Sequence, residues 1–439
     1  MTNDTQPSRS LGGGNVFAAP AAPATPDSPP GAQGTPIALW LVLLAAAGAF
    51  ALTMGTRQTM GLFLSALNTS TALGIGSISL AFAFGQLWWG LTQPFAGAVA
   101  DRIGTGRVIL LGVALVALGT FITPYMTTTA GLIFAIGVLA AGGAGMAGPS
   151  VLMAATARLV PAHKRGLASG IVNAGGSFGQ FVMAPIAIGL TAAVGWASAM
   201  QWLGVLVLLA LPAVWVLRGN SNALAAQAAA ASGQKALTAR EAIGQALATP
   251  SYRYLAAGFL VCGFHVAFLA THLPGVIAAC GLPPEIGGWS LAMIGLFNIV
   301  GSLAMGWAVG RWRMKSLLSL LYATRGLAVL IFLLAPKTPT VVLVFAAVMG
   351  VTFLSTVPPT VGLVAKMFGT ANMAMLFGIV MLAHQIGGFF GAYLGGTVFQ
   401  ATGSYDWVWY IDIVLAVGAA LVNLPIREAR LVRPAPAAA

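Results

Sequence analysis

Long apolar stretches separated by short polar connectors fill this chain from residue 37 to residue 426. A helix that crosses a bilayer needs about 20 mostly apolar residues, and twelve stretches of the chain have that length. Their expected ranges are 37–65, 77–99, 107–125, 130–157, 166–193, 197–217, 254–279, 287–309, 316–335, 339–365, 371–399 and 406–426. Because this number is even, both chain ends should lie on the same side of the membrane. The pattern therefore predicts an all-α membrane protein with twelve transmembrane helices.

The pattern is interrupted at both ends and in the middle. Residues 1–35 are rich in Pro, Ala, Gly and Ser and contain few charges, which predicts a disordered tail. Residues 219–250 are rich in Ala, Ser and Gln, and they divide the spans into two groups of six. The expected organisation is a tail at 1–35, a six-helix bundle at 36–218, a linker at 219–250, a second six-helix bundle at 251–426 and a tail at 427–439.

The two groups of spans repeat each other. Residues 170–172 (Gly-Ile-Val) in the fifth span recur as residues 378–380 in the eleventh. The pair 148–149 (Gly-Pro) in the fourth span corresponds to 358–359 (Pro-Pro) in the tenth. Such an internal repeat predicts two related six-helix bundles with a binding site between them, near the middle of the bilayer.

Composition agrees with a membrane protein and adds an orientation. The chain is 58% hydrophobic and 6% charged, with a mean hydropathy of +0.91, whereas soluble proteins average about 45–50% apolar and 25% charged residues. All but three of the 20 Lys and Arg lie at the chain ends or in connectors on the same side. Basic connectors of this kind face the cytoplasm. We therefore expect a multi-pass protein of a bacterial-type inner (plasma) membrane, with both termini and the linker cytoplasmic.

The net charge of +12 does not indicate a nucleic-acid partner, because the basic residues are spread over short connectors. The sequence also contains no pattern typical of a soluble enzyme, such as a phosphate-binding Gly-x-x-x-x-Gly-Lys loop or a Cys/His metal spacing. Cys262 and Cys280 lie at the two ends of one predicted helix, roughly 27 Å apart at about 1.5 Å per residue, which is too far for a disulfide. We expect no enzyme activity, no cofactor and no metal.

The connector between the second and third spans has the sequence GAVADRIGTGR at residues 97–107, and a copy without the Asp follows the eighth span at residues 306–315. It resembles the loop signature of the major facilitator superfamily. The resemblance implies a fold of two six-helix bundles and transport of a small molecule by alternating access. It also implies a conformational role for five residues of the loop. These are Gly97, Asp101, Arg102, Gly104 and Arg107.

Within that superfamily the N-terminal half is most similar to the branch of monocarboxylate transporters and oxalate/formate exchangers. The similarity lies in residues 57–64 (RQTMGLFL) and 165–170 (RGLASG). Monocarboxylate transporters have a Lys at the place of Arg57, and that Lys engages the substrate carboxylate. The resemblance therefore implies that Arg57 binds an anion. It does not extend to the eighth span, where Asn298 and Ser302 stand in place of an Asp and an Arg.

Arg57 also stands out without the resemblance, because it lies about two helical turns inside the first span. A charge at that depth costs at least about 2.5–3.5 kcal/mol and favours a partner or a wet cavity. The N-terminal spans contain no Asp or Glu to pair with it. Two interpretations remain, an incoming anion or a structural arginine that reaches the membrane surface or bonds to carbonyls.

Arg325 in the ninth span is the second deep cation, and Asp412 in the twelfth span is its expected partner. We expect these two residues to form a buried structural pair or to be satisfied separately, with a direct functional role as the alternative. A buried ion pair is weak evidence for net stability, but removing one member strands the other.

Three histidines in the spans can bind a proton near neutral pH, because the unperturbed pKa of histidine is about 6.5. His265 and His272 share one face of the seventh span, and His384 lies in the eleventh. They are candidates for proton coupling. The alternative is that each is an interior histidine that hydrogen-bonds neighbouring helices.

Polar side chains form stripes on several spans, and such stripes line a substrate path or bind helices together. Asn173 and Gln180 share a face of the fifth span with Ser177. The full set of substrate-binding candidates is Arg57, Gln58, Asn173, Gln180, His265, His272, Asn298 and Gln385.

Taken with the resemblance, these residues predict a monomeric secondary transporter that moves a small organic anion, a monocarboxylate in the first instance, together with a proton. Exchange of one anion for another is an alternative, as is efflux of a neutral or anionic compound. Efflux of cationic drugs is disfavoured, because the first span offers a cation and no carboxylate. A membrane sensor that transports nothing is a more remote alternative.

Overall fold

The computed structural model describes residues 2, 36–73, 75–218 and 238–429. The predicted N-terminal tail apart from residue 2, most of the predicted linker and the last ten residues lie outside this range. All regular secondary structure in the described residues is helical, which confirms the expected all-α class.

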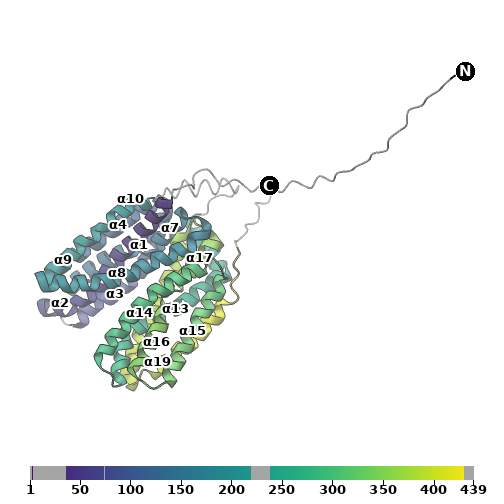
Figure 1. Ribbon diagram of the computed structural model, residues 1–439. Helices are drawn as coiled ribbons and strands as arrows, with labels where there is room; N and C mark the ends of the chain where they lie inside the picture. The colour runs from purple at the N-terminus through teal and green to yellow at the C-terminus, as the bar shows by residue number, and fades with distance from the viewer. Residues whose placement is uncertain (1, 3–35, 74, 219–237, 430–439) are drawn as a thin grey trace.

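The helices form two lobes, which correspond to the two halves of the chain (Figure 1). The first lobe contains α1 (Pro36–Thr59), α2 (Leu64–Thr71), α3 (Ile75–Ile103), α4 (Thr105–Ile122), α5 (Thr129–Leu132), α6 (Gly142–Met146), α7 (Pro149–Leu159), α8 (Arg165–Val194), α9 (Trp196–Val207) and α10 (Leu211–Leu217). The second contains α12 (Ala239–Ala248), α13 (Pro250–Ala279), α14 (Pro284–Ala308), α15 (Met314–Leu334), α16 (Pro339–Thr352), α17 (Val357–Phe368), α18 (Met373–Thr402) and α19 (Asp406–Asn423). Short 3-10 turns and one π-helical stretch, Ile133–Ala141, join helices within a span.

Eleven helical stretches of the described residues are long and apolar enough to cross a membrane, against the twelve that we predicted. The difference is α3, which is 29 residues long but is made less apolar by Gln86 and Gln93 and by its two terminal charges, Asp101 and Arg102. These two glutamines face the inside of the protein, where Gln93 is fully buried and Gln86 is half-buried. A helix shielded from lipid can contain such residues.

The fourth and tenth spans are each broken at the place where the two halves repeat each other. In the fourth span the break at Ala147–Gly148 precedes Pro149, and in the tenth α16 stops at Thr352 before Pro358 and Pro359. Proline has no backbone N–H and clashes with the preceding turn, so a continuous helix through these points is disfavoured. The second break leaves backbone groups for side chains of other helices to bind.

One helix, α12, was not expected. It lies within residues 219–250, which we predicted to be a linker, and Thr238 and Glu241 cap its first turn reciprocally. The Thr238 hydroxyl accepts from the Glu241 N–H, and the Glu241 carboxylate accepts from the Thr238 N–H. This capping box stabilises a short helix before α13 begins at Pro250.

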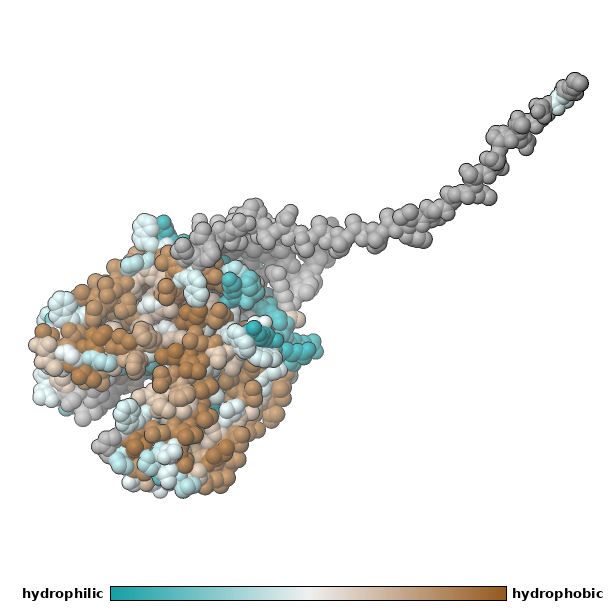
Figure 2. All heavy atoms as spheres, viewed as in Figure 1, coloured by the Kyte–Doolittle hydropathy of each residue, from teal (hydrophilic) through white to brown (hydrophobic). Residues whose placement is uncertain are grey.

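The lobes touch at the end where α1 begins and α19 finishes, and they separate toward the opposite end (Figure 1). The helix pairs in contact between the lobes include α3 with α18, α8 with α14, α7 with α18 and α8 with α17. The backbones approach so closely that a Cβ on Gly97 would stand 2.4 Å from the backbone of Ala374. Hydrophilic residues gather at the touching end, whereas the sides of both lobes are hydrophobic (Figure 2).

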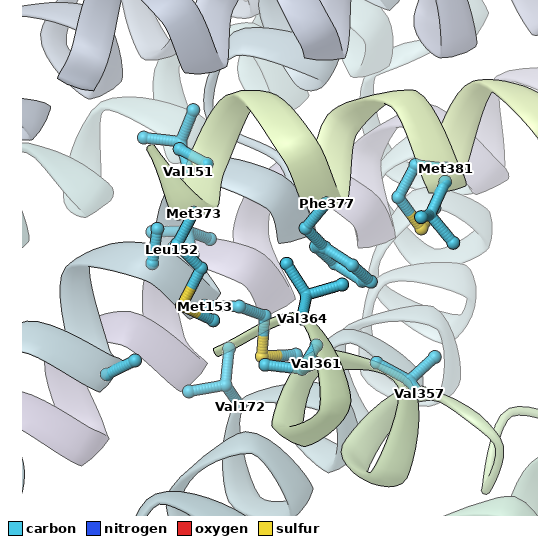
Figure 3. Packing of buried hydrophobic residues seen from close by; sticks show 14 of the residues in the cluster. Val151, Leu152, Met153, Val172, Val357, Val361, Val364, Met373, Phe377 and Met381 are labelled. Carbon is cyan, nitrogen blue, oxygen red and sulfur yellow. The ribbon is translucent and has the colours of Figure 1, made fainter. Parts of the chain in front are cut away.

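An apolar cluster with members from both lobes fills the touching end (Figure 3). It includes Val151, Leu152 and Met153 on α7, Val172 on α8, Val357, Val361 and Val364 on α17, and Met373, Phe377 and Met381 on α18. These side chains are almost fully buried. Their burial closes one end of the molecule, and the other end stays open as a cleft between the lobes (Figure 2).

Candidate functional site

Arg57 lies in the last turn of α1, where the C-terminal end of the helix dipole favours a cation. Its Nη1 donates to Oε1 of Gln86 on α3 at 2.8 Å. Its guanidinium also lies over the ring of Trp89, with Cζ 4.5 Å from the ring centroid. The side chain is half-buried, and its Nε has no hydrogen-bond partner. Arg57 is thus held in position while part of its donor capacity stays unused.

A chain of hydrogen bonds extends from Arg57 into the other lobe. Nε2 of Gln86 donates to Oε1 of Gln385 on α18 at 2.8 Å, and Nε2 of Gln385 lies 3.2 Å from Nδ1 of His384. Gly90 permits this approach, because a Cβ at that position would stand 2.5 Å from Cγ of Gln385. Arg57, Gln385 and His384, which we predicted separately, therefore belong to one polar site at the junction of the lobes.

Asn173 and Asn298, two further predicted residues, fasten α8 to α14. Nδ2 of Asn173 donates to Oγ of Ser302 at 2.8 Å, and Nδ2 of Asn298 donates to Oγ of Ser177 at 2.6 Å. All four side chains are buried. Of the two interpretations that the sequence allowed, these contacts match the one in which polar groups bind helices together.

Both asparagines also bind the break in the tenth span at Leu354. Its N–H donates to Oδ1 of Asn298 at 3.0 Å, and its carbonyl accepts from Nδ2 of Asn173 at 3.2 Å. Because Asn173 belongs to the first lobe and Leu354 to the second, this contact crosses the interface. The break is therefore part of the junction between the lobes.

The other predicted substrate residues lie in different surroundings. Gln58 is exposed and Gln180 is half-buried on α8. Nε2 of His272 lies 2.7 Å from the carbonyl oxygen of Ala392, and the imidazole packs between the rings of Phe268 and Tyr405. His272 therefore links α13 to α18. It does not belong to the chain of hydrogen bonds that begins at Arg57.

The touching end of the molecule contains the predicted loop residues. Oδ2 of Asp101 accepts from the N–H of Met375 at 3.0 Å, in the first turn of α18, where unpaired amides and the helix dipole favour an anion. Arg158 forms an ion pair with Asp101, and it donates to the carbonyls of Thr370 and Ala371. This charged group ties the first lobe to the second beside the apolar cluster.

The remaining loop residues have simpler roles. Gly104 has a φ of 98°, which only glycine adopts without strain, and it lets the chain reverse between α3 and α4. Arg102 and Arg107 are exposed at that end. Gly97 provides the close approach to α18 described above.

Arg325 and Asp412 do not form the direct ion pair that we expected. The Arg325 guanidinium donates to the carbonyl oxygens of Thr352 and Phe353 where α16 ends, the latter at 2.6 Å, and to Sγ of Cys262 at 3.4 Å. The side chain of Asp412 lies beside His265 instead, with Nε2 of the imidazole 3.2 Å from Oδ1. The alternative of separate satisfaction matches the structure, because carbonyls freed by the helix end compete for the arginine.

Several of these partners could not be assigned from sequence. Gln86, Trp89 and Arg158 are not among the site residues that we predicted. The one sequence signal for the break that binds Arg325 is the Pro358-Pro359 pair. No group of His, Cys, Asp and Glu that could hold a metal ion occurs among the described residues.

Comparisons with known proteins agree with this architecture. The family model of the Major Facilitator Superfamily matches residues 39–338 and 255–439. Monocarboxylate transporter 13 of Rattus norvegicus is 25% identical over 391 residues, which covers 88% of this chain and 89% of the relative. The uncharacterized MFS-type transporter YcxA of Bacillus subtilis is 25% identical over 397 residues, covering 88% and 94%. The oxalate:formate antiporter of Oxalobacter formigenes is 22% identical over 373 residues, covering 82% and 84%.

Two solved structures share the fold. The proton:xylose symporter XylE superposes with a TM-score of 0.67 at 15% identity, covering 88% of this chain and 95% of that one. The transporter FucP, in its outward conformation, superposes with a TM-score of 0.64 at 14% identity, covering 88% and 98%.

Proposed function

Because the chain belongs to the Major Facilitator Superfamily, we propose that it moves a small organic anion, a monocarboxylate in the first instance, across the membrane by alternating access. Its relatives and structural neighbours are transporters, and the chain is a multi-pass membrane transporter and not an enzyme. The substrate class is our inference from the site at the junction of the lobes.

The observation that supports an anionic substrate is the state of Arg57. Its guanidinium is half-buried, and its hydrogen bond goes to the neutral amide oxygen of Gln86. In the part of the chain that the structure describes, no ion pair includes Arg57. A carboxylate that accepted hydrogen bonds from Nε and a terminal nitrogen would supply the missing charge in bidentate geometry. A neutral or cationic ligand would leave the guanidinium without a counter-ion.

The Gln86–Gln385 hydrogen bond suggests how substrate binding in the first lobe affects the second lobe. A carboxylate at Arg57 would compete with Oε1 of Gln86 for the same guanidinium, and Gln86 is bonded to the second lobe through Gln385. Release or rotation of Gln86 would therefore alter a contact that crosses the junction. A site placed between two lobes, with residues from both, is what alternating access requires.

The orientation follows from the basic connectors. Arg158 and the exposed Arg102 and Arg107 lie at the touching end of the lobes. If that end faces the cytoplasm, as the positive-inside rule predicts, both termini are cytoplasmic and the cleft opens to the outside. The described structure would then be the outward-open state of a transporter in the inner membrane.

Proton symport and anion exchange are both compatible with the comparisons. One distant relative is named an oxalate:formate antiporter, and one structural neighbour is a proton:xylose symporter. In this chain the buried imidazoles of His265 and His384 and the half-buried His272 are the proton-coupling candidates. We favour symport, because a proton that enters with a monocarboxylate cancels its charge.

The test is counterflow in proteoliposomes against a panel of mono- and dicarboxylates, with and without an imposed pH gradient. Arg57→Gln removes a charge-assisted hydrogen bond worth about 1.5–3 kcal/mol, so we expect the half-saturation concentration to rise roughly 10- to 100-fold. Arg57→Lys keeps the charge and should retain part of the activity.

Arg311→Gln is the matched control, because Arg311 also lies over a tryptophan ring, that of Trp307, but is exposed and is not part of the hydrogen-bonded chain that begins at Arg57. Arg311→Gln should transport normally. Unchanged counterflow by well-folded Arg57→Gln would refute the anion-binding role. Counterflow in the wild type without any response to the pH gradient would favour exchange over symport.

A further inference from the structure

The second lobe contains a buried ionisable cluster that the substrate site does not use. We infer that Asp412 and His265 form a proton-binding site, and that its charge controls the junction of the lobes through Arg325 and the break at residues 353–356. The inference rests on the proposed function in one respect, which is that a proton is the coupling ion.

Asp412 is the carboxylate best placed to hold such a proton. In the described membrane-spanning helices it is the one acidic residue in a helix interior, because Asp101, Glu285 and Asp406 lie at helix ends. Its side chain is 1% exposed, as is that of His265. Nε2 of His265 and Oδ1 of Asp412 lie 3.2 Å apart, so the charge of each side chain affects proton binding at the other.

Four polar atoms of the cluster have unused hydrogen-bonding capacity. Nδ1 of His265, Nε of Arg325, Nε2 of His384 and Oδ1 of Asp412 are buried without a hydrogen-bond partner. Buried polar atoms normally have hydrogen-bond partners. An exception in a cluster of ionisable groups is explained by a bound proton, a bound water molecule or a second arrangement of the side chains. All three possibilities are features of a site that gains and loses a proton.

The surroundings of Asp412 include ionisable groups from each helix packed against α19. The groups that interact within the cluster are His265 and Cys262 on α13, Arg325 and Tyr322 on α15, and His384 on α18. With Arg325 charged, Asp412 ionised and His265 neutral, the cluster has no net charge. Binding one proton forms a single O–H or N–H bond and makes the cluster a cation, and release of the proton breaks that same bond.

Arg325 connects this charge to the backbone of the tenth span. Its guanidinium holds the carbonyls of Thr352 and Phe353, which the end of α16 leaves without helical partners. The charge of Arg325 also acts on Asp412, although the two side chains form no direct ion pair. The backbone carbonyls of the break and the carboxylate of Asp412 therefore compete for the guanidinium of Arg325. The outcome depends on whether Asp412 is ionised.

The break transmits the outcome to the first lobe. Leu354, the next residue after Phe353, is bound on both sides by Asn298 and Asn173, and Asn173 belongs to α8 of the first lobe. A shift of Arg325 from the break toward Asp412 would release Thr352 and Phe353 and loosen this contact. The observed arrangement, with Arg325 on the break and the cleft open, corresponds to a protonated Asp412.

A second route links the cluster to Arg57. The thiol of Cys262 accepts from Arg325 and interacts with the imidazole of His384. His384 is the end of the hydrogen-bonded chain through Gln385 and Gln86 to Arg57. Hydrogen bonds therefore lead from Arg57 as far as His384, and an electrostatic interaction between His384 and Cys262 connects them to the proton site.

The experiment measures the opening of the cleft as a function of pH without any substrate. Spin labels at Ser70→Cys, in α2, and Ser404→Cys, before α19, report the separation of the lobes at the open end in a Cys280→Ser background (Figure 1). In full-length protein in lipid nanodiscs we expect the long distance to dominate at pH 5 and a shorter one to gain population at pH 9. In Asp412→Asn the proportion of the two distances should not change with pH.

Asp406→Asn is the matched control, because it removes an exposed carboxylate from the start of the same helix. Asp406→Asn should shift with pH as the wild type does. If Asp412→Asn does not fold, His265→Gln serves instead, and a wild-type response that moves to a different pH in His265→Gln supports the site. A wild type without pH response, an Asp412→Asn protein that keeps the response, or an Asp406→Asn protein that loses it would overturn the inference.

Transport separates this inference from the proposed function. Asp412→Asn should retain counterflow, which needs no net proton movement, and lose accumulation driven by a pH gradient. A wild type that transports none of the carboxylates would refute the proposed substrate class and leave the distance measurement as an independent test. Loss of counterflow together with accumulation in folded Asp412→Asn would count against a site separate from the anion site.

Discussion

Arg57 and Arg325 are the same residue type at membrane depth, one in each lobe, and their surroundings differ in what they leave for a ligand. Arg57 is half-buried, is bonded to one neutral amide oxygen and retains a free Nε at the junction of the lobes. Arg325 is 1% exposed, and its terminal nitrogens donate hydrogen bonds to two backbone carbonyls and a thiol. A buried cation whose hydrogen bonds are all made within the protein stabilises the fold. A cation that lacks an anionic partner can instead bind an anion from solution.

The largest expected effect tests the structural side of this comparison. Arg325→Leu would leave the carbonyls of Thr352 and Phe353 unsatisfied and would remove the cation beside Asp412. Removing one member of a buried charged group costs on the order of 3–5 kcal/mol, so we expect a large fall in the yield of folded protein and in its melting temperature. Fluorescence-detected size-exclusion chromatography after heating gives the measurement.

Arg57→Gln is the matched variant for that comparison, and it should melt close to the wild type. Equal stability of Arg325→Leu and Arg57→Gln would contradict the assignment of structural and ligand-binding roles to the two residues. A strong loss of stability in Arg57→Gln would indicate that the half-buried arginine is structural after all.

The next largest effect is expected when a carboxylate is placed beside Arg57. Gln86→Glu changes one amide into a carboxylate of the same size, 2.8 Å from Nη1 of Arg57. The new carboxylate would occupy the guanidinium and compete with the substrate anion. We expect the half-saturation concentration in counterflow to rise roughly 10-fold or more, as for the loss of about 1.4 kcal/mol or more of binding free energy.

The pH dependence of Gln86→Glu has a definite sign. Protonation of the introduced Glu at low pH removes its charge and its competition, so affinity should recover as the pH falls. Gln93→Glu, about two helical turns further along α3, is not a suitable control because Gln93 is fully buried. Gln58→Glu, at an exposed position of α1, is the matched control. Equal loss in both variants would point to a general effect of added negative charge.

The sequence was sufficient to predict most of the fold, because apolar length and the positions of Lys and Arg are properties of the chain alone. The helix α3 was predicted as the span 77–99, although polar residues that face the protein interior make it less apolar than its neighbours. One element escaped the prediction. The helix α12 is short and polar, and its one local signal was Thr238 followed three residues later by Glu241.

The site was less predictable than the fold. Arg57 was evident as a charge inside an apolar span, but its link to the second lobe joins Gln86 to Gln385, residues 299 positions apart. Such contacts depend on how α3 packs against α18. Arg325 shows the same limit, because Asp412 was the natural charge partner in the sequence, and the carbonyls that hold Arg325 became available only where the tenth span breaks.

The smallest expected effect concerns the ring beneath Arg57. Trp89 lies 4.5 Å from the guanidinium carbon of Arg57, and a cation–π contact of this kind is worth about 0.5–2 kcal/mol. Trp89→Leu should therefore weaken anion affinity by roughly 2- to 30-fold, whereas Trp89→Phe keeps an aromatic face and should lose less. Tyr322→Leu beside Arg325 is the matched removal of a ring in the other lobe, and because backbone carbonyls hold that arginine, the counterflow affinity of the folded protein should be unaltered. An equal loss in Trp89→Leu and Tyr322→Leu would mean that the two arginines respond alike, against the division of roles that their surroundings indicate.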